Sequence, residues 1–168
     1  MTASAFASAF HISRIDVTAL GLLISAAMLA PAAAEVATLA PRPNIALRVL
    51  ILPAAGTPVA TAVLLAGGHG RLGIGEDGRI ADLGNNFVIR NRQTFAAQGL
   101  AVIVMDAPSD RPQGLGTRTD AAHTTDLGAV VAYARQRFRM PVWLVGTSRG
   151  TISAVNAAAR LSVATRPD

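Results

Sequence analysis

A short apolar segment runs directly into a serine flanked by glycines, and this junction constrains the fold more than any other feature. Residues 142–145 read VWLV, residues 146–150 read GTSRG, and a helix-like stretch follows. A strand that meets a helix through Gly-x-Ser-x-Gly needs a tight bend with strained dihedral angles at the serine. The flanking glycines let the two backbones approach closely. The hydroxyl of Ser148 is therefore predicted to stand at the top of a sheet, over a helix N-terminus.

The rest of the chain alternates apolar runs with amphipathic stretches. The patterns predict strands over residues 45–52, 59–66, 100–105 and 142–145, and helices over residues 86–98, from 119 or 120 to 138, and 150–161. Strands that alternate with helices of this length imply β-α-β units, and right-handed crossovers place the helices on both faces of the sheet. We therefore expect an α/β fold with a mostly parallel sheet and helices on both faces.

Helical spacing predicts which residues of the two longer helices face the core. The inward residues should be Leu127, Val130, Val131, Ala134 and Phe138 in the first helix, and Ile152, Val155 and Leu161 in the second. Residues 67–86 have no helical period and are rich in glycine. Loops this long in a compact domain usually serve a function.

The N-terminal stretch resembles a targeting segment rather than part of the fold. An uncharged run over residues 17–34 follows His11 and Arg14 and ends in alanines. A charged start, an apolar middle and a small-residue end predict a signal peptide over residues 1–34 and an exported protein, periplasmic or secreted. An uncleaved membrane anchor is the alternative, since the run is near the lower limit for spanning a bilayer. Pro31 and the alanines favour cleavage, which would leave residues 35–168 without stable membrane insertion.

Composition argues against several classes of function. The chain has a formal net charge of +5, and all of its basic residues are arginine. Nucleic-acid binding is disfavoured because these arginines are scattered and aromatic residues are few. The absence of cysteine and of paired histidines at ligand spacing predicts no metal site, and no cofactor is expected. The oligomeric state cannot be inferred from the pattern.

Two backbone amides should accompany Ser148 if it attacks an acyl group. One is the N–H of the residue after the serine, Arg149, and the other comes from the loop after the third strand of such a sheet. The glycine-rich run at residues 67–70 best matches that loop. Gly68 is our first choice for the second donor, and His69 is the alternative.

Longer segments resemble a known superfamily. The segment MDAPSDR at residues 105–111, the segment PVWLVGTSRGT at residues 141–151 and the glycine-rich loop after LLAGG are similar to secreted bacterial α/β hydrolases, of the dienelactone-hydrolase-like or serine-aminopeptidase-like kind. The resemblance covers about residues 45–165, the N-terminal part of that fold. It implies a serine hydrolase that acts on a small ester, lactone or peptide-like acyl substrate. It also implies a triad in the chain order serine, acid, histidine.

The chain departs from that pattern after the serine. The only acidic residue beyond Ser148 is Asp168, and no histidine follows. A serine without a base to take its proton attacks an acyl carbon poorly. We therefore expect a domain truncated on its C-terminal side that is inactive and poorly soluble alone, with the strand at residues 142–145 as an exposed edge. A non-catalytic pseudoenzyme or fragment is the alternative.

Other polar residues near the expected site have less demanding interpretations. His69 could replace the missing base, but a role in loop structure is the preferred interpretation. His123 should cap or pack at a helix start. Asp106 and Asp110 should bind loop amides, and the guanidinium of Arg149 could pair with either carboxylate.

A dinucleotide-binding domain is the remaining alternative. Gly68, Gly70 and Gly73 spell Gly-x-Gly-x-x-Gly after a strand, and Asp106 ends another strand. The third glycine of that fingerprint should lie in a helix, with the acid about 20 residues further on. Neither condition is met, so this interpretation ranks below the hydrolase.

Overall fold

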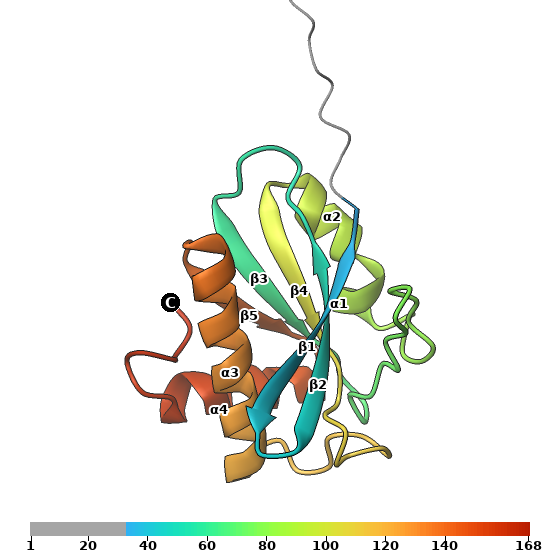
Figure 1. Cartoon of the computed structure of the whole chain (residues 1–168), viewed down its shortest axis with the longest axis vertical. Coiled ribbons are helices and arrows are strands. Elements are labelled where there is room, and N and C mark those ends of the chain that lie inside the picture. The colour runs from blue at the N-terminus through green and yellow to red at the C-terminus, as the bar shows by residue number, and fades with distance from the viewer. Residues whose placement is uncertain (1–32) are drawn as a thin grey trace, which may run out of the picture.

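Five strands form a single mixed sheet in the computed structural model, which describes residues 33–168 (Figure 1). The strands are β1 (Glu35–Arg42), β2 (Ile45–Leu52), β3 (Ala60–Leu65), β4 (Leu100–Met105) and β5 (Val142–Gly146). The helices are α1 (Phe87–Arg90), α2 (Arg92–Ala97), α3 (Ala121–Phe138) and α4 (Arg149–Arg160). The predicted signal peptide lies outside the described residues, apart from its last two positions. Within the described part, no helix is long and apolar enough to cross a membrane.

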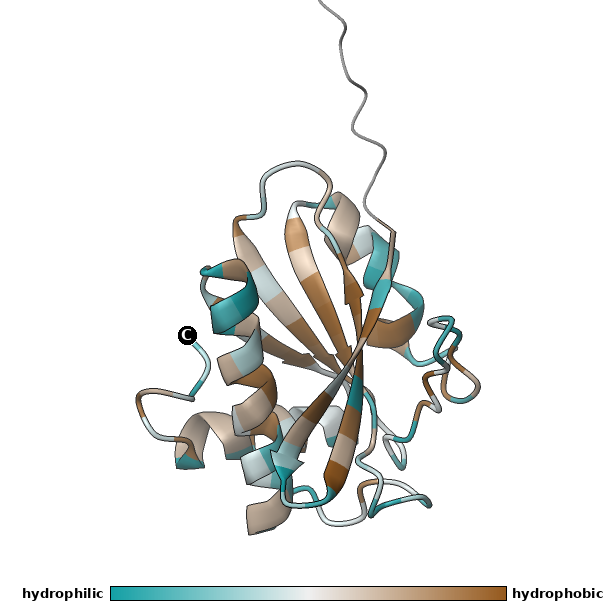
Figure 2. Cartoon of the chain, viewed as in Figure 1, coloured by the Kyte–Doolittle hydropathy of each residue, from teal (hydrophilic) through white to brown (hydrophobic). Residues whose placement is uncertain are grey.

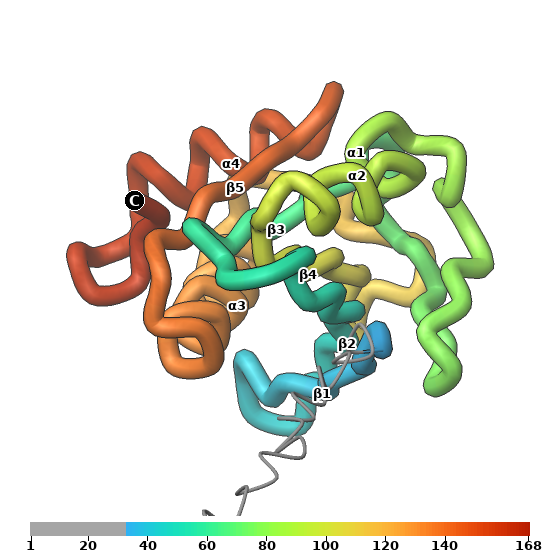
Figure 3. Tube along the Cα trace, turned by 90° about the horizontal axis from the view of Figure 1, so that it is seen from above, coloured from blue at the N-terminus to red at the C-terminus, as the bar shows by residue number. Residues whose placement is uncertain are grey.

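The order of the strands across the sheet is β1-β2-β4-β3-β5. Strands β4, β3 and β5 run parallel, whereas β1 and β2 pair antiparallel with their neighbours. Figure 3 shows β1 and β5 at opposite ends of the sheet, with α4 beside β5. The carboxyl ends of the three parallel strands meet at one edge, and this edge carries the Ser148 bend and the glycine-rich loop.

Both faces of the sheet are covered, which confirms the predicted α/β architecture. On one face, buried residues of the strands pack against Leu127, Val130, Val131 and Ala134 of α3 and Ala157 of α4. On the other face, the strands pack against Val88, Ile89 and Ala96 of α1 and α2, together with Leu72 and Ile74 of the loop. The central strands are apolar along most of their length (Figure 2). This burial on both faces explains why β4 reads as an unbroken hydrophobic run and β3 as a run that only Thr61 interrupts.

The structure corrects two expectations about the elements. Strand β1 was not predicted; it is only partly buried and pairs with β2 through a tight turn at Asn44, whose φ is 59°. The helix expected over residues 86–98 is broken at Asn91 into α1 and α2. Asn86 does not cap this helix through its side chain, which instead accepts a hydrogen bond from Thr147 Oγ1.

The predicted inward face of α4 is wrong. Ile152 and Val155 are 47% and 63% exposed, while Leu161 packs partly against the core. The buried positions are instead small or polar, namely Gly150, Ser153, Asn156 and Ala157. The helix starts so close to β3 that a Cβ at Gly150 would collide with the Leu65 carbonyl group. Small residues must therefore face the sheet, and the larger apolar side chains point outward.

Candidate active site

Ser148 sits at the bend between β5 and α4 with a backbone that a non-glycine residue seldom adopts. Its φ is 52° and its ψ is −125°, and it precedes the first residue of α4. Such dihedral angles cost about 1–3 kcal/mol and persist only where the surroundings enforce them. The side chain is exposed and forms no capping hydrogen bond with the helix. The bend thus presents the hydroxyl to solvent at the N-terminus of α4.

The two glycines of the motif permit this bend. A Cβ at Gly146 would overlap the backbone of Gly150, and a Cβ at Gly150 would overlap the Leu65 carbonyl group. Both positions therefore require the absence of a side chain, rather than a left-handed backbone, since neither has a positive φ. The close contact of strand and helix keeps Ser148 in its strained conformation.

The glycine-rich loop after β3 lies directly against the serine. A Cβ built on Gly67 would lie 3.0 Å from Ser148 Cβ and 3.0 Å from the Thr147 carbonyl oxygen. The hydrogen bond of 3.2 Å from Thr147 Oγ1 to Asn86 Oδ1 ties the bend to the start of α1. The structure thus brings the predicted serine and the predicted loop together.

The backbone amides of Gly68, His69 and Arg149 at this place have free hydrogens. Among residues 33–168, no acceptor receives the N–H of Gly68, His69 or Arg149. Arg149 is the first residue of α4, where helix geometry leaves the amide without an intrahelical partner. Gly68 has a φ of 54°, which favours glycine there. Free amides beside a serine hydroxyl can stabilise an oxyanion that develops there.

The side chain of His69 is engaged away from the serine. Its Nδ1 accepts a hydrogen bond from the Arg71 backbone N–H at 3.2 Å, and its Nε2 lies 3.3 Å from Asp82 Oδ2. Both ring nitrogens therefore have partners within the glycine-rich loop. This arrangement agrees with a role in loop structure and leaves neither nitrogen free to take a proton from Ser148.

Asp106 holds the glycine-rich loop from the end of β4. Its carboxylate accepts hydrogen bonds from the backbone N–H groups of Leu72 at 2.6 Å, Gly73 at 3.2 Å and Ile74 at 2.7 Å. The predicted role of this carboxylate in binding loop amides is therefore confirmed. The arrangement does not match a dinucleotide fingerprint, because residues 71–86 form loop and isolated bridges rather than a helix that begins at Gly73.

The expected pairing of Arg149 with a carboxylate is wrong. The Arg149 guanidinium donates to the backbone carbonyl of Gly116 instead. Asp110 was expected to bind loop amides, but it accepts two hydrogen bonds from Arg42, at 2.8 and 3.0 Å. Arg42 also holds the fully buried Asp126 at 2.7 Å. These hydrogen bonds lower the pKa of Asp110 and attach the β1–β2 hairpin to α3.

A buried polar cluster lies beneath the loop, and sequence reasoning missed its central residue, Arg118. The Arg118 Nη1 donates to Ser153 Oγ at 3.0 Å, and this oxygen lies 2.8 Å from His123 Nε2. Burial, followed by the charges of Arg118 and Arg111, lowers the pKa of His123 to about 4, so the ring is neutral at pH 7. In a chain whose basic residues are all arginine, nothing in the local pattern separates a buried arginine from a surface one.

Asp168 lies at the wrong end of β5 to assist the serine. Its Oδ2 accepts from the Val142 backbone N–H and from Arg135 Nη2, each at 2.9 Å. These bonds lower the pKa of Asp168, the backbone bond contributing most. Val142 begins β5 and Ser148 follows its other end. The only acidic residue after the serine is thus occupied and remote from it.

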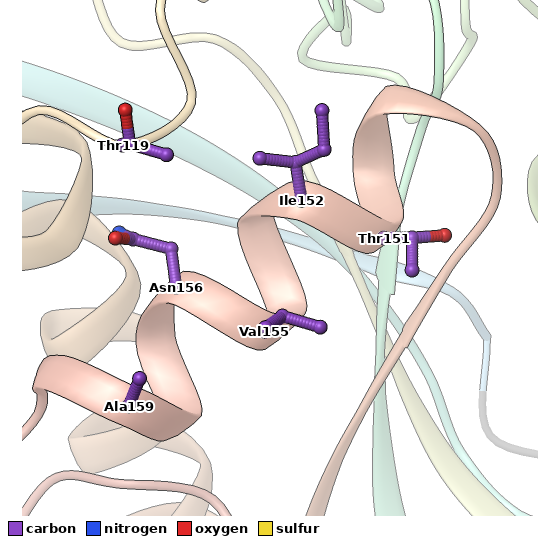
Figure 4. A pocket seen from close by; sticks show the side chains of 6 residues that line it. All are labelled: Thr119, Thr151, Ile152, Val155, Asn156 and Ala159. Atoms are coloured by element: carbon purple, nitrogen blue, oxygen red, sulfur yellow. The ribbon is translucent and has the colours of Figure 1, made fainter.

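An apolar groove of about 390 Å³ runs along the outward face of α4 (Figure 4). It is lined by Thr119, Thr151, Ile152, Val155, Asn156 and Ala159. Ser148 and the glycine-rich loop do not line it, but it reaches Thr151, whose backbone N–H donates to the Ser148 carbonyl oxygen at 3.0 Å. No group of three or more His, Asp or Glu side chains that could hold a metal ion occurs in the described part of the chain.

Comparisons with known proteins agree on the fold. No protein-family model matches the chain, and no curated protein matches it. Among solved structures, an α/β serine hydrolase homologue from Coxiella burnetii is similar, with a TM-score of 0.54, 18% identity and coverage of 75% of this chain and 58% of that chain. An α/β serine hydrolase without a lid from Xanthomonas campestris gives a TM-score of 0.54, 24% identity and coverage of 78% and 58%. Brefeldin A esterase gives a TM-score of 0.52, 19% identity and coverage of 73% and 33%.

The chain therefore has the α/β-hydrolase fold over the part that these structures share with it. It spans about 58% of the length of the first two.

Proposed function

We propose that Ser148 is the nucleophile of a serine hydrolase site that acts on an ester, lactone or peptide-like acyl group. The observation that carries the proposal is the strained, exposed bend at φ 52° and ψ −125°, which lies at the N-terminus of α4 with the Ser148 Cβ close to Gly67. Strained backbone conformations of this kind cluster at functional sites, where the surrounding structure enforces them. The fold shared with solved α/β serine hydrolases supports the assignment.

In this proposal the free amides stabilise the negative charge that develops on the substrate. Attack of Ser148 Oγ on an acyl carbon forms the C–O bond and moves charge to the carbonyl oxygen. The N–H groups of Arg149 and Gly68, with His69 as the alternative, donate to that oxyanion. Loss of one such donor costs about 100- to 1000-fold in kcat in a serine protease. No cofactor enters this chemistry, and the substrate is a small acyl compound met outside the cytoplasm if the predicted signal peptide directs export.

We also propose that the 168-residue polypeptide does not turn over substrate alone. His69 is engaged with Asp82, His123 is buried with Ser153, and Asp168 lies beyond the far end of β5. No described group is thus available to take the Ser148 proton as a general base. We expect no hydrolysis of p-nitrophenyl acetate above the rate of the Ser148→Ala variant.

External imidazole can replace the missing base and expose the nucleophile. We propose to treat the full chain with a fluorophosphonate in the presence of increasing imidazole. The Ser148 Oγ–P bond forms as the P–F bond breaks, fluoride leaves, and the hydroxyl proton passes to imidazole. Labelling should occur at Ser148, rise with imidazole concentration and disappear in Ser148→Ala.

Ser162 provides the matched control. It is exposed, and its Oγ contacts only Thr165 Oγ1 at 3.1 Å, with no part in the strained bend. The Ser162→Ala variant should label as the native chain does. Equal labelling of Ser148 and Ser162, or none at either, contradicts the proposed nucleophile and favours the non-catalytic alternative.

A further inference from the structure

The least expected residue near the serine is the buried guanidinium of Arg118. Its residue is only 3% exposed, and it forms no ion pair with any carboxylate among residues 33–168. Burial, followed by the charge of Arg149, lowers its pKa to about 10, so it remains a cation at pH 7. A buried cation without a counter-ion is costly, and hydrogen bonds from its N–H groups offset only part of that cost.

The hydrogen bonds of Arg118 converge on the loop beside the serine. Its Nη2 donates toward the carbonyl oxygens of three consecutive residues, Ala66 at 3.2 Å, Gly67 at 3.4 Å and Gly68 at 3.0 Å. The next carbonyl, that of His69, accepts from the Leu115 backbone N–H at 2.7 Å. Arg118 thus holds three successive carbonyl groups, and the segment before α3 holds the fourth.

Peptide geometry converts these bonds into a constraint on the amides. In a planar trans peptide, the C=O of one residue points opposite to the N–H of the next. Fixing the Gly67 carbonyl therefore fixes the N–H of Gly68, and fixing the Gly68 carbonyl fixes the N–H of His69. These are the two amides proposed as the second oxyanion donor, and both lack an acceptor among the described residues.

We infer that Arg118 is a positioning residue that orients the oxyanion amides of the loop by holding their neighbouring carbonyls from below. The inference deepens the proposed function and rests on it. Arg118 does not touch the reacting atoms; it acts through the peptide planes at residues 67–69. Ser153 Oγ accepts a hydrogen bond from Nη1, the other terminal nitrogen, and so fixes the position of the guanidinium relative to the loop.

Glycines at two positions allow close packing around the Arg118 side chain. A Cβ on Gly70 would lie 2.7 Å from Leu115 Cδ1 and 3.0 Å from Arg118 Cζ, and Gly70 has a φ of 78°. A Cβ on Gly114 would lie 2.8 Å from His69 Cβ. Glycines at both places let the segment before α3 close over the loop. The fit argues that the position of Arg118 is specific rather than a chance burial.

The test compares Arg118→Lys with Arg135→Lys in the full chain. Lysine keeps the charge but cannot reach three carbonyls and Ser153 at once. Arg135 also donates to a carbonyl group, that of Ala164, but far from the serine. Two quantities are measured: the imidazole-assisted rate of Ser148 phosphonylation, and the amide ¹⁵N and ¹H shifts of Gly68 and His69.

Arg118→Lys should lower the phosphonylation rate about tenfold or more and shift the Gly68 and His69 amide signals, because a misplaced oxyanion donor is the expected defect. Arg135→Lys should change neither. If Arg118→Lys does not fold, as judged by circular dichroism, Ser153→Ala replaces it, with an expected loss of a few fold.

The outcomes separate the two proposals. Native labelling at Ser148 with an unchanged rate in the Arg118 variant overturns the positioning role and leaves the nucleophile in place. Unchanged Gly68 and His69 signals overturn it as well. Failure of the native chain to label at Ser148 overturns the proposed function, and with it the catalytic purpose of Arg118.

Discussion

At the scale of single residues, the serine bend depends on two neighbouring glycines, which have no side chain. A Cβ at Gly146 would collide with the Gly150 backbone, and a Cβ at Gly150 would collide with the Leu65 carbonyl group, so neither position tolerates a side chain. Ser148 itself has φ 52° and an exposed side chain. The strain at Ser148 is thus sustained by backbone contacts on either side of it.

Gly150→Ala should therefore destabilise the chain strongly. The new methyl group meets a backbone oxygen that cannot rotate away, and we expect a loss of at least about 3 kcal/mol in the free energy of unfolding. The matched control is Gly84→Ala, where a Cβ meets nothing within 4 Å and no left-handed φ is required. Its unfolding free energy should be unchanged or higher by up to about 1 kcal/mol. Chemical denaturation of both variants checks the prediction, and equal stabilities would contradict it.

His123 should make the stability depend on pH. Its folded pKa of about 4 lies below the ordinary value of 6.5, because the ring is buried near Arg118 and Arg111, with Asp120 opposing weakly. The unfolded chain therefore binds the proton first as the pH falls. The free energy of unfolding is therefore highest above pH 6.5, and it falls by roughly 3 kcal/mol as the pH is lowered from 6.5 to 4.

His123→Gln provides the test of this pH dependence. Glutamine can still bond to Ser153 but does not titrate, so the difference in stability between pH 6.5 and 4 should shrink by most of that amount. Denaturation curves at several pH values measure it. An identical pH slope in the native chain and the variant would show that His123 does not titrate in this way.

At the scale of elements, the glycine-rich loop is a folded unit rather than a free connection. Leu72 and Ile74 are fully buried or nearly so, at 0% and 1% exposure, and pack with α1 and α2 against the sheet. Asp106 accepts hydrogen bonds from the backbone N–H groups of Leu72 and Ile74, and Arg118 donates to the carbonyl of Gly68, earlier in the loop. Two oppositely charged side chains thus hold the loop from within the fold.

Asp106→Asn should loosen the loop without removing its apolar contacts. One amide oxygen replaces two carboxylate oxygens, and the new NH₂ group faces backbone N–H donors that it cannot satisfy. We expect a loss of about 2–4 kcal/mol in unfolding free energy and faster hydrogen exchange at Leu72 and Ile74.

Asp77→Asn is the control for this change. Asp77 accepts from one backbone N–H, that of Arg79, in an exposed turn of the same loop. Its replacement should alter stability by less than about 0.5 kcal/mol. Hydrogen exchange followed by mass spectrometry distinguishes the two, and equal protection in both variants would refute the role given to Asp106.

At the scale of the whole molecule, the β5 side of the sheet leaves apolar surface exposed. Trp143 is 46% exposed and Val155 of α4 is 63% exposed. Among residues 33–168, strand β5 pairs with β3 alone, and at its other edge only Val142 is engaged, through hydrogen bonds exchanged with Asp168. An unpaired parallel edge with apolar side chains favours association between copies.

We expect the chain to self-associate as its concentration rises, and Val155→Lys to shift it toward monomer. The added charge disrupts an apolar contact on α4 at no cost to the core. Val59→Lys is the control, because Val59 is similarly exposed at 66% but precedes β3. Sedimentation velocity measures the effect. Equal association of both variants would place the contact elsewhere.

Much of the fold could be predicted because it rests on local patterns. Strands β2 to β5 are mostly apolar runs, and Asp120 caps α3 through the His123 N–H. The predicted stripe of α3 is buried except for Phe138, which is partly buried. Strand β1 escaped because its residues are half exposed and alternate weakly. The outward orientation of Ile152 and Val155 was not predicted, because the close contact of Gly150 with β3, and not hydrophobicity, sets the rotation of α4.

The sequence by itself determined strands β2 to β5, the place of the helical segments between them and the place of the Ser148 bend, because runs, periods and glycine spacing act over a few neighbouring residues. Only the tertiary structure decided that Arg118 lies beneath Gly67 and Gly68, and that His69 faces Asp82. Arg118 is about 50 residues from the carbonyls that it binds, and such a pairing arises only when the parallel strands bring their ends together.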